Sequence, residues 1–511
     1  METRKVRVRF APSPTGGLHL GGVRTALFNY LLAKRSGGDF ILRIEDTDRT
    51  RYVEGAEEYI INALKWCGIE PNEGQGFGGG PYSPYRQSER KESGIYKKYA
   101  DKLLEGGHAY YAFDTAEELD AMRKRLEAAK VAAPQYNSVS RQNMRNSLSL
   151  SDDEVQKLLS QGVPYVIRLK VPRNEEIRFQ DLIRGWVSVQ STQVDDKVLL
   201  KSDGMPTYHL AHVVDDIEMK ISHVVRGEEW LPSAPAHLLL YRFLGCEEQM
   251  PKLAHLPLIL KPDGNGKLSK RDKSGLPMFP LNWHDSSTGE TYTGYKEHGF
   301  FSDAFINMLA LLGWNPGTNQ EIFNAAELIQ LFSLERVNKA GAKFDPEKTK
   351  WFNQQYLRNK SEEVLAEMVR PYINSEKPFS KEFLTEFCRL MKEKVYFIHQ
   401  FWEQGSYFFV RPNKFDQDVI SKRWSTKSSM LLQLLAKELS ILENFNAAEV
   451  ELKFKMCCEN LDIPPGQLMQ LLRVAVSGVG GGPALFEMMA LLGAQECVCR
   501  LEKAVVLFPK F

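Results

Sequence analysis

Three residues suited to binding phosphate lie together near the start of the chain. His19, Gly21 and Gly22 follow the Pro- and Gly-rich stretch 12–17 and stand where a helix over about 20–34 begins. A helix N-terminus offers unpaired N–H groups and partial positive charge, and therefore binds phosphate. Glycine lets a backbone or a flat ring come close, and His19 can donate a hydrogen bond to a phosphate oxygen. Taken alone, the pattern also fits a histidine that caps the helix or lies on the surface.

A second stretch far along the chain carries cations on both sides of a hydroxyl group. It reads Lys267-Leu268-Ser269-Lys270-Arg271 and follows the Gly- and Asp-rich turn 262–266. Three cations around a hydroxyl suit the negative charge that builds up during transfer of a phosphoryl or nucleotidyl group. The alternative is a solvated basic loop, as most charge runs are. The stretch is not a P-loop, since the first glycine and the final Ser or Thr of that motif are both missing.

The first stretch requires a strand before it and another after its helix. Residues 6–10 alternate apolar and basic, which is typical of a strand, and residues 40–45 form a short apolar run. Between them, apolar residues at helical spacing run from Leu20 to Leu31. The order strand, loop, helix, strand predicts a β-α-β unit and a parallel sheet.

Together the two stretches resemble the paired signatures of the class I aminoacyl-tRNA synthetases, here HLGG and KLSK. Five further stretches resemble the bacterial-type glutamyl-tRNA synthetases: RFAPSPTG (9–16), RIEDTD (43–48), YRQS (85–88), PTYHLA (206–211) and RGEEW (226–230). The resemblance extends over essentially the whole chain. It implies an α/β Rossmann-like catalytic domain with an α+β insertion, followed by an all-α C-terminal anticodon-binding half. Glutaminyl and archaeal-type glutamyl enzymes carry β-barrels in place of that helical half.

Glutamate has one ammonium and two carboxylate groups, so its pocket needs one acid and at least two cations. By resemblance, the glutamate-binding residues are Arg9, Ala11, Ser13, Glu45, Tyr208, His212 and Arg226. We assign Glu45, with Ser13, to the ammonium, and Arg9, with Tyr208, to the side-chain carboxylate; Arg226 meets a carboxylate. Glu45 follows a parallel strand, where ligands bind in open α/β sheets. The alternatives are a surface pair of Glu45 with Arg43 or Arg49, and structural ion pairs for the two arginines.

His212 stands where the family commonly has Asn. A neutral imidazole would replace the amide as a donor, whereas a protonated one would add positive charge beside the substrate carboxylate. An inert packing change is equally compatible with the sequence. The substitution bears on the discrimination between glutamate and glutamine.

The resemblance also implies an ATP site and a reaction. The ATP-binding residues would be His19, Gly21, Gly22, Glu229, Trp230, Lys267, Ser269, Lys270 and Arg271, with His19, Lys267 and Lys270 as the catalytic groups. Mg²⁺ would be held by phosphates and water, so no residue is assigned to a metal. The expected activity is glutamate–tRNA ligation, with L-glutamate, ATP and tRNA(Glu) as substrates.

Two alternatives to that activity remain, a non-discriminating enzyme that also charges tRNA(Gln) and a non-catalytic tRNA-binding relative. A shorter relative that acts on queuosine in tRNA(Asp) lacks an anticodon domain, and the helical C-terminal half argues against it. Anticodon reading relies on stacking aromatics and basic groups. The candidates on the C-terminal helices are Arg358, Arg411, Lys422 and Arg423.

The composition restricts the location and the partners of the protein. The 511 residues carry a net charge of +1, so a nucleic-acid surface must be a local patch. The seven cysteines match no zinc or disulfide framework, and no secretion signal or membrane-spanning run is evident. We therefore expect a cytoplasmic protein without a membrane partner, and a monomer.

The predicted domains are a catalytic first half (1–107), an acceptor-stem-binding insertion (108–190), a catalytic second half (191–260), a KLSK and stem-contact region (261–342) and a helical anticodon-binding region (343–511). Some relatives carry a zinc cluster in the insertion. Here Ala112, Asp114, Tyr136 and Ser138 occupy that neighbourhood, so no structural zinc is expected. Residues 272–299 form a longer connection than the family leads us to expect, and their composition predicts a surface loop or small hairpin.

Overall fold

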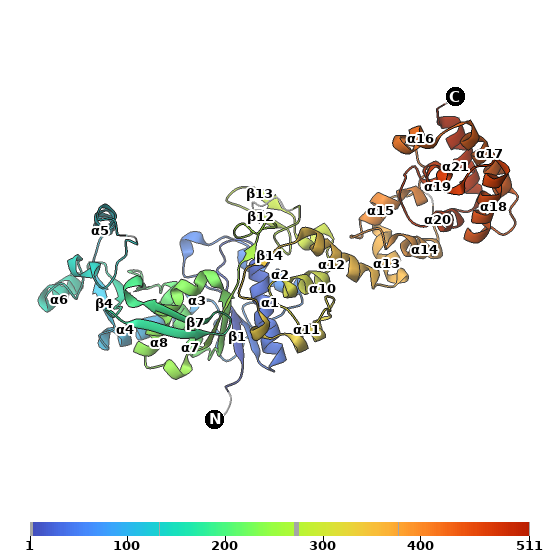
Figure 1. The fold of residues 1–511 in the computed structure, drawn as a ribbon. Coiled ribbons are helices and arrows are strands. Elements are labelled where there is room, and N and C mark those ends of the chain that lie inside the picture. Colours follow the sequence, from blue (N-terminus) through green and yellow to red (C-terminus); the bar gives the residue numbers. More distant parts are fainter. Residues whose placement is uncertain (1–3, 132, 270–274, 377, 510–511) are drawn as a thin grey trace. The chain divides into compact units, whose positions relative to one another are not determined.

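The computed structural model describes residues 4–131, 133–269, 275–376 and 378–509 (Figure 1). The chain divides into two units, one of residues 1–298 and 305–346 and the other of residues 299–304 and 347–511. None of the helices in the described part of the chain is long and apolar enough to span a lipid bilayer.

A β-α-β unit opens the first unit, as the sequence predicts. Strands β1 (Arg7–Phe10) and β2 (Asp39–Leu42) pair in parallel, and helix α1 (Leu20–Arg35) connects them. Strand β3 (Glu73–Gly74) extends this sheet beside β2. All four residues of β1 are buried, which explains why the run of alternating apolar and basic residues still forms an interior strand.

A second sheet continues the first, and its strand order is β7-β6-β10-β9. Its members are β6 (Glu176–Asp181), β7 (Gly185–Gln190), β9 (His223–Gly227) and β10 (Lys252–Leu256). The amide of Ser222 donates a hydrogen bond of 2.8 Å to the carbonyl of Arg7, so β9 begins beside β1 (Figure 1). Strands β6 and β7, which fall within the predicted insertion 108–190, therefore join the catalytic sheet.

The rest of that insertion forms a small α+β body. Strands β4 (Ala109–Ala112), β5 (Val166–Leu169) and β8 (Val198–Leu200) make an antiparallel sheet, with helices α5 (Ala116–Ala128) and α6 (Asp152–Ser160). Strand β8 lies beyond the predicted end of the insertion at residue 190, in the stretch assigned to the catalytic second half. Where some relatives hold zinc, Asp114 accepts hydrogen bonds from the Tyr136 hydroxyl (2.8 Å) and the Arg145 amide (2.7 Å). A hydrogen-bonded cluster thus ties this region together.

The remaining elements of the first unit surround the two sheets. They are α2 (Ala56–Trp66), α3 (Gln87–Lys91), α4 (Ile95–Glu105), α7 (Tyr208–Glu218), α8 (Ala234–Phe243), β11 (Ile259–Leu260), β12 (Trp283–Asp285), β13 (Glu290–Tyr292), α9 (Tyr295–His298), α10 (Ser302–Leu311), α11 (Ala325–Leu331) and β14 (Ala342–Lys343). Strand β11 pairs in parallel with β14, which the sequence did not indicate. Strands β12 and β13 form the small hairpin predicted within 272–299.

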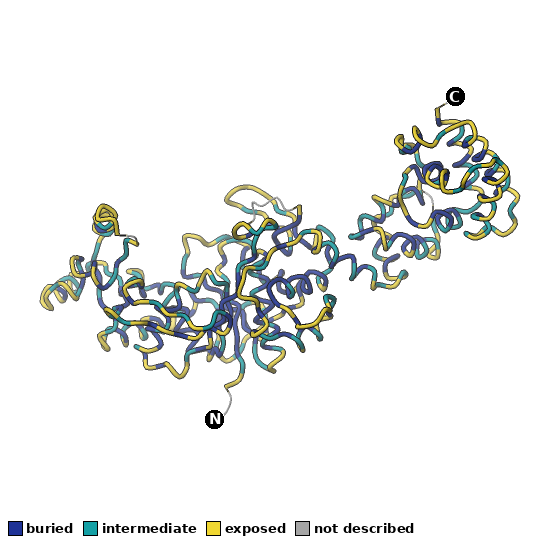
Figure 2. The backbone as a smooth tube through the Cα atoms, viewed as in Figure 1, coloured by how far each residue is buried: buried dark blue, intermediate teal, exposed yellow. Residues whose placement is uncertain are grey.

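The second unit is helical, as predicted. Its helices are α12 (Pro346–Arg358), α13 (Glu362–Val369), α14 (Lys381–Met391), α15 (Gln400–Gly405), α16 (Gln417–Arg423), α17 (Thr426–Ser440), α18 (Ala447–Asn460), α19 (Pro465–Ser477), α20 (Leu485–Leu492) and α21 (Ala494–Leu507). Their inward faces are buried around Phe387, Leu435 and Leu472 (Figure 2). Helix α19 ends at the predicted break, where Gly478 adopts a left-handed φ of 83°.

Candidate active site

A cleft of about 800 Å³ opens beyond the carboxyl ends of β1, β2 and β9. Residues from both signature stretches line it. The predicted residues on its wall are Arg9, Ala11, Ser13, His19, Gly21, Gly22, Glu45, Tyr208, His212, Arg226, Glu229, Trp230, Lys267 and Ser269. Lys270 and Arg271, also predicted for the site, lie outside the described residues. Segments some 250 positions apart therefore share one cavity.

His19 is the N-cap of α1. Its Nδ1 accepts a hydrogen bond of 3.2 Å from the amide of Gly21, which leaves Nε2 as the ring atom that can carry a proton. The side chain is open to the cleft, and withdrawal from bulk water together with the charge of Lys267 lowers the pKa of His19. His19 is thus a cap, as one reading of the sequence held, and also a neutral donor at the start of α1. The amides of Leu20, Gly21 and Gly22 at that end donate to the Met278 carbonyl, the His19 ring and the His19 carbonyl.

Lys267 reaches the opposite wall of the cleft. Its Nζ lies 3.3 Å from Oε1 of Glu229, and both side chains remain about half exposed. An exposed pair of this kind contributes little to stability and is easily exchanged for another partner. Lys267 can therefore leave Glu229 for the phosphate of a ligand.

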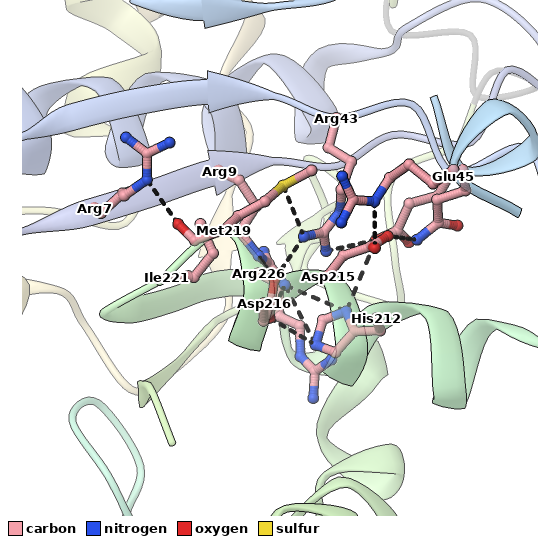
Figure 3. A network of polar contacts seen from close by, with 12 residues as sticks. Arg7, Arg9, Arg43, Glu45, His212, Asp215, Asp216, Met219, Ile221 and Arg226 are labelled. Atoms are coloured by element: carbon pink, nitrogen blue, oxygen red, sulfur yellow. Dashed lines mark hydrogen bonds and ion pairs between the residues drawn. The ribbon is translucent and has the colours of Figure 1, made fainter. Parts of the chain in front are cut away.

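Arg9 is buried and paired, as the alternative reading of the sequence allowed. Its Nε and Nη2 donate to the two carboxylate oxygens of Asp216, at 3.1 and 3.3 Å. Asp216 also accepts from Nη1 of Arg43 at 2.7 Å (Figure 3). These two cations outweigh the effect of burial and hold the pKa of Asp216 well below its ordinary value. Nη1 of Arg9 has no hydrogen-bond partner among the described residues, and Arg9 lines the cleft.

Glu45 also pairs with Arg43, but inside the protein and not on its surface. Its Oε1 accepts from Nη2 of Arg43 at 3.0 Å, and Glu45 is only 6% exposed. Burial alone would raise its pKa, but the nearby imidazole of His212 and the charge of Arg43 lower it. Glu45 is therefore an ionised carboxylate on the wall of the cleft.

Arg226 is a buried cation without an acidic partner. Its three nitrogens donate to Nε2 of His255 (3.0 Å), the hydroxyl of Tyr208 (2.7 Å) and the carbonyl of Trp230 (3.3 Å). All three acceptors are neutral, and no carboxylate of the described chain lies within ion-pair distance of this guanidinium. Arg226 is 6% exposed and lines the cleft. An uncompensated charge at such a position is costly, and a carboxylate ligand removes that cost.

A second acid fixes the orientation of Arg226 through His255. Nδ1 of His255 lies 2.6 Å from Oδ2 of Asp181, and both residues are fully buried or nearly so. Asp181 can only accept, so the proton stands on Nδ1 and Nε2 is free to accept from Arg226. Burial lowers the pKa of His255, which keeps this tautomer neutral despite the carboxylate.

His212 is neutral in this environment. Burial lowers its pKa to about 4, although Asp216 and Glu45 work in the opposite direction. Its ring nitrogens lie 3.3 Å from Nη2 of Arg9, and it stacks on His237 at 4.6 Å between ring centroids. The ring is therefore a neutral imidazole beside Arg9, and its role toward a substrate, as against an inert packing change, stays a prediction.

Several residues on the wall of the cleft or buried behind it are absent from the set predicted from the sequence. Asp216 and Arg43 organise the buried charges, and Asp181 and His255 orient Arg226. Arg24, on α1, donates to the carbonyl oxygens of Pro257 and Leu312, and burial lowers its pKa to about 10. Met278, Phe279, Trp283, Asp285 and Ser287 add a wall from the 272–299 segment. Only the unusual length of that segment signalled it in the sequence.

Comparison with protein families identifies the fold that builds this cleft. A family model described as "tRNA synthetases class I (E and Q), catalytic domain" matches residues 5–351. The chain belongs to this class I synthetase family. A second model, described as "Anticodon binding domain", matches residues 364–505 of the synthetase.

Individual relatives are similar over nearly their full length. The synthetase is 52% identical to a glutamate–tRNA ligase of Cytophaga hutchinsonii, with 98% of each chain covered. It is 51% identical to a glutamate–tRNA ligase of Bacteroides fragilis over 99% of each chain. The crystal structure of a glutamate tRNA ligase from Elizabethkingia meningosepticum in complex with its amino acid matches with a TM-score of 0.93 and 48% identity. That match covers 99% of this chain and all of the other.

Two of the four basic residues considered for anticodon reading are engaged within the synthetase. Arg358 pairs with Glu393 at 2.8 Å, and Arg411 makes a two-pronged pair with Glu496. Lys422 and Arg423 are exposed at the end of α16, without an ion pair to any described residue. The latter two are the stronger candidates for contacting RNA.

Proposed function

We propose that this class I synthetase is a glutamate–tRNA ligase that activates L-glutamate with ATP and transfers it to the 3′-terminal adenosine of tRNA(Glu). Relatives named glutamate–tRNA ligase, about half identical over the whole chain, support the assignment. The observation that carries the choice of substrate is Arg226, a buried guanidinium on the cleft wall with neutral partners only. Every α-amino acid brings one carboxylate, and glutamate brings the second one that a cleft with both Arg226 and the open Nη1 of Arg9 can accept.

The glutamate would lie among the buried charges of the cleft. Glu45, with Ser13, would hold the ammonium, and the free Nη1 of Arg9 would meet the side-chain carboxylate. Tyr208 accepts from Arg226, so its own O–H proton can point to the substrate, and burial raises its pKa to about 12. Tyr208 therefore remains a donor at neutral pH.

ATP would lie between the start of α1 and residues 267–271, which we call the lysine-rich loop. His19, Gly21 and Gly22 would face its phosphates from one side, and Lys267, Ser269, Lys270 and Arg271 from the other. Glu229 and Trp230 would border the adenosine. Mg²⁺ would enter with the phosphates, because no cluster of three or more His, Cys, Asp or Glu groups among the described residues could hold it unaided.

The reaction needs positioning and charge stabilisation more than a reactive side chain. The α-carboxylate of glutamate attacks the α-phosphorus of ATP in line, the bond to the β-phosphate oxygen breaks, and pyrophosphate leaves. The 2′-hydroxyl of the terminal ribose then attacks the mixed anhydride, and AMP departs. Neutral His19 and the lysines stabilise the charge that gathers on the phosphates.

A pyrophosphate-exchange assay with purified full-length protein tests the proposal. Glutamate-dependent exchange, measured with and without tRNA, is expected at rates well above those with glutamine or aspartate. Parallel charging of tRNA(Glu) and tRNA(Gln) distinguishes a discriminating from a non-discriminating enzyme. A protein that binds tRNA(Glu) but exchanges no pyrophosphate under either condition would be the non-catalytic relative, and the proposal would fail.

A further inference from the structure

A hairpin that follows the lysine-rich loop packs against the loop that carries His19. We call residues 276–294 the cover hairpin; they include β12 and β13, which pair antiparallel from Trp283 opposite Tyr292 to Asp285 opposite Glu290. Met278, Phe279 and Trp283 line the cleft. None of the roles assigned above uses this segment.

The side chain of Trp283 lies between Gly17, in the loop that precedes α1, and helix α2. Only 7% of it is exposed, and a Cβ built on Gly17 would lie 2.7 Å from Cγ and Cδ2 of its ring. On its other side, the ring of Tyr59 lies 5.0 Å away, nearly perpendicular at 71°. In such close packing a displacement of one group shifts the other, because a movement of Gly17 or of the indole alone would create a clash or a cavity.

Hydrogen bonds to backbone groups of the cover hairpin fasten it to α1 and α2. The amide of Leu20, the first residue of α1, donates to the carbonyl of Met278 at 2.9 Å. The hydroxyl of Tyr59 donates to the carbonyl of Leu281 (2.6 Å) and accepts from its amide (3.2 Å). The first N–H groups of a helix lack intrahelical partners, so the bond from Leu20 fixes the start of α1 directly beside His19.

We propose that the cover hairpin is a positioning element for ATP activation, in which Trp283 acts through Gly17 to hold His19 against the phosphates. The inference rests on the proposed function, since it needs ATP at His19. Met278 follows Ser269 by nine positions, so one short piece of chain joins the lysine-rich loop to the residue that anchors α1.

The first test replaces Trp283 in the full-length protein. Trp283→Ala should lower kcat/KM for ATP in pyrophosphate exchange by about 30-fold, since a misplacement of about 1 Å can cost up to about 100-fold. The KM for glutamate should stay within about twofold, because the glutamate-binding groups do not contact the hairpin. Trp283→Phe, which keeps an aromatic ring, should restore most of the activity. Thr293→Ala, an exposed change near the end of the cover hairpin at a side chain without a hydrogen bond to any described residue, is the matched control and should behave as wild type.

A second test approaches the same contact from Gly17. Gly17→Ala should reduce kcat/KM for ATP because its methyl group meets the indole, and the double variant Gly17→Ala/Trp283→Ala should be more active than Gly17→Ala alone. Suppression of this kind indicates a positioning contact, because two substitutions that only reduced stability would have additive effects. If Trp283→Ala does not fold, Gly17→Ala and Trp283→Phe still measure the contact.

Two outcomes separate this inference from the function on which it rests. The wild type could be active while the folded Trp283→Ala variant keeps kcat/KM for ATP within about threefold of it and the double variant shows no suppression. That result overturns the role of the hairpin only. A wild type without glutamate-dependent exchange overturns the proposed function, and the inference with it.

Discussion

Acidification should destabilise the catalytic unit because that unit contains histidines that are buried in their neutral form. His209, His212 and His237 lie together on α7 and α8, and burial lowers the pKa of His209 to about 3, that of His212 to about 4 and that of His237 well below its ordinary value. In the unfolded chain each would titrate near pH 6.5. As the pH falls below that value, the unfolded state takes up protons that the folded state refuses, so the free energy of unfolding falls until the folded pKa is reached.

The expected size follows from these values. Between pH 7 and pH 5, His209 and His212 each lower the free energy of unfolding by about 2 kcal/mol, or about 4 kcal/mol together, and His237 acts in the same direction. That is a large share of a typical domain stability of about 5–15 kcal/mol. Glu45 and Asp216, with lowered pKa values, lose their contribution only below their unfolded values near pH 4. The raised pKa of buried Asp215 works in the opposite direction at the acid end of the range.

Urea unfolding of the full-length protein at pH 9, 7, 6 and 5 measures the effect. Hydrogen exchange read by mass spectrometry on peptides of α7 and α8 follows the catalytic unit separately from the helical unit. Stability should be flat from pH 9 to 7 and fall steeply below. His209→Gln, which retains a partner for His237, should reduce the slope by less than one third, because burial also lowers the pKa values of His19, His223 and His255 in the same unit. A fall of less than about 2 kcal/mol between pH 7 and 5, or an unchanged slope in that variant, would refute the burial of neutral histidines.

Four substitutions test the site, each by glutamate-dependent pyrophosphate exchange. Arg226→Lys should lower kcat/KM for glutamate by about 100-fold, because an ammonium cannot reproduce the three-way guanidinium contacts; a loss of under about fivefold would contradict this. His255→Ala should raise the KM for glutamate by about tenfold with little change in kcat, because Arg226 then loses the acceptor that orients it; an equal fall in kcat and in kcat/KM, with an unchanged KM, would argue against positioning. Glu45→Gln should raise that KM by about 10- to 100-fold through loss of the charge facing the ammonium; unchanged affinity would remove Glu45 from the ammonium site. Lys270 is predicted from the sequence to be a catalytic group, so Lys270→Ala should lower turnover by roughly two to three powers of ten while barely altering glutamate affinity, as for other preorganised donors; near-normal turnover would contradict this role for Lys270.

Local features of the chain are predicted well from the sequence. The switch from strand to helix periodicity after Gly17 places β1 and α1, and the paired motifs bring His19 and Lys267 into one cleft. These features depend on neighbouring residues or on a shared motif order. The helical second unit follows in the same way from the spacing of apolar residues and the Pro and Gly breaks.

The partners of the buried charges could not be predicted in this way. Asp216 lies 207 positions from Arg9, and Asp181 lies 74 positions from His255. Which acid meets which base depends on how the sheet is assembled, and β6 joins it from within a stretch assigned to the insertion. The sequence therefore indicates that Arg9 and Arg226 are present but not that one is paired and the other is not.

That asymmetry explains how the cleft can select an acidic amino acid. Two carboxylates, those of Asp216 and Glu45, lie among three guanidinium groups, those of Arg9, Arg43 and Arg226. With His212 neutral, these five groups alone carry one net positive charge, since the carboxylate of Asp181 lies one residue further from Arg226, behind His255. A glutamate at neutral pH carries one net negative charge. Glutamine has an α-carboxylate but no side-chain carboxylate, so it would satisfy only one of the two guanidinium groups, those of Arg9 and Arg226, that can receive a carboxylate from the cleft, and a site built for two such groups rejects a ligand that brings one. A protonated imidazole at His212 would add a second uncompensated charge, which is why a substitution of Asn by His is compatible with this pocket only when burial keeps the ring neutral.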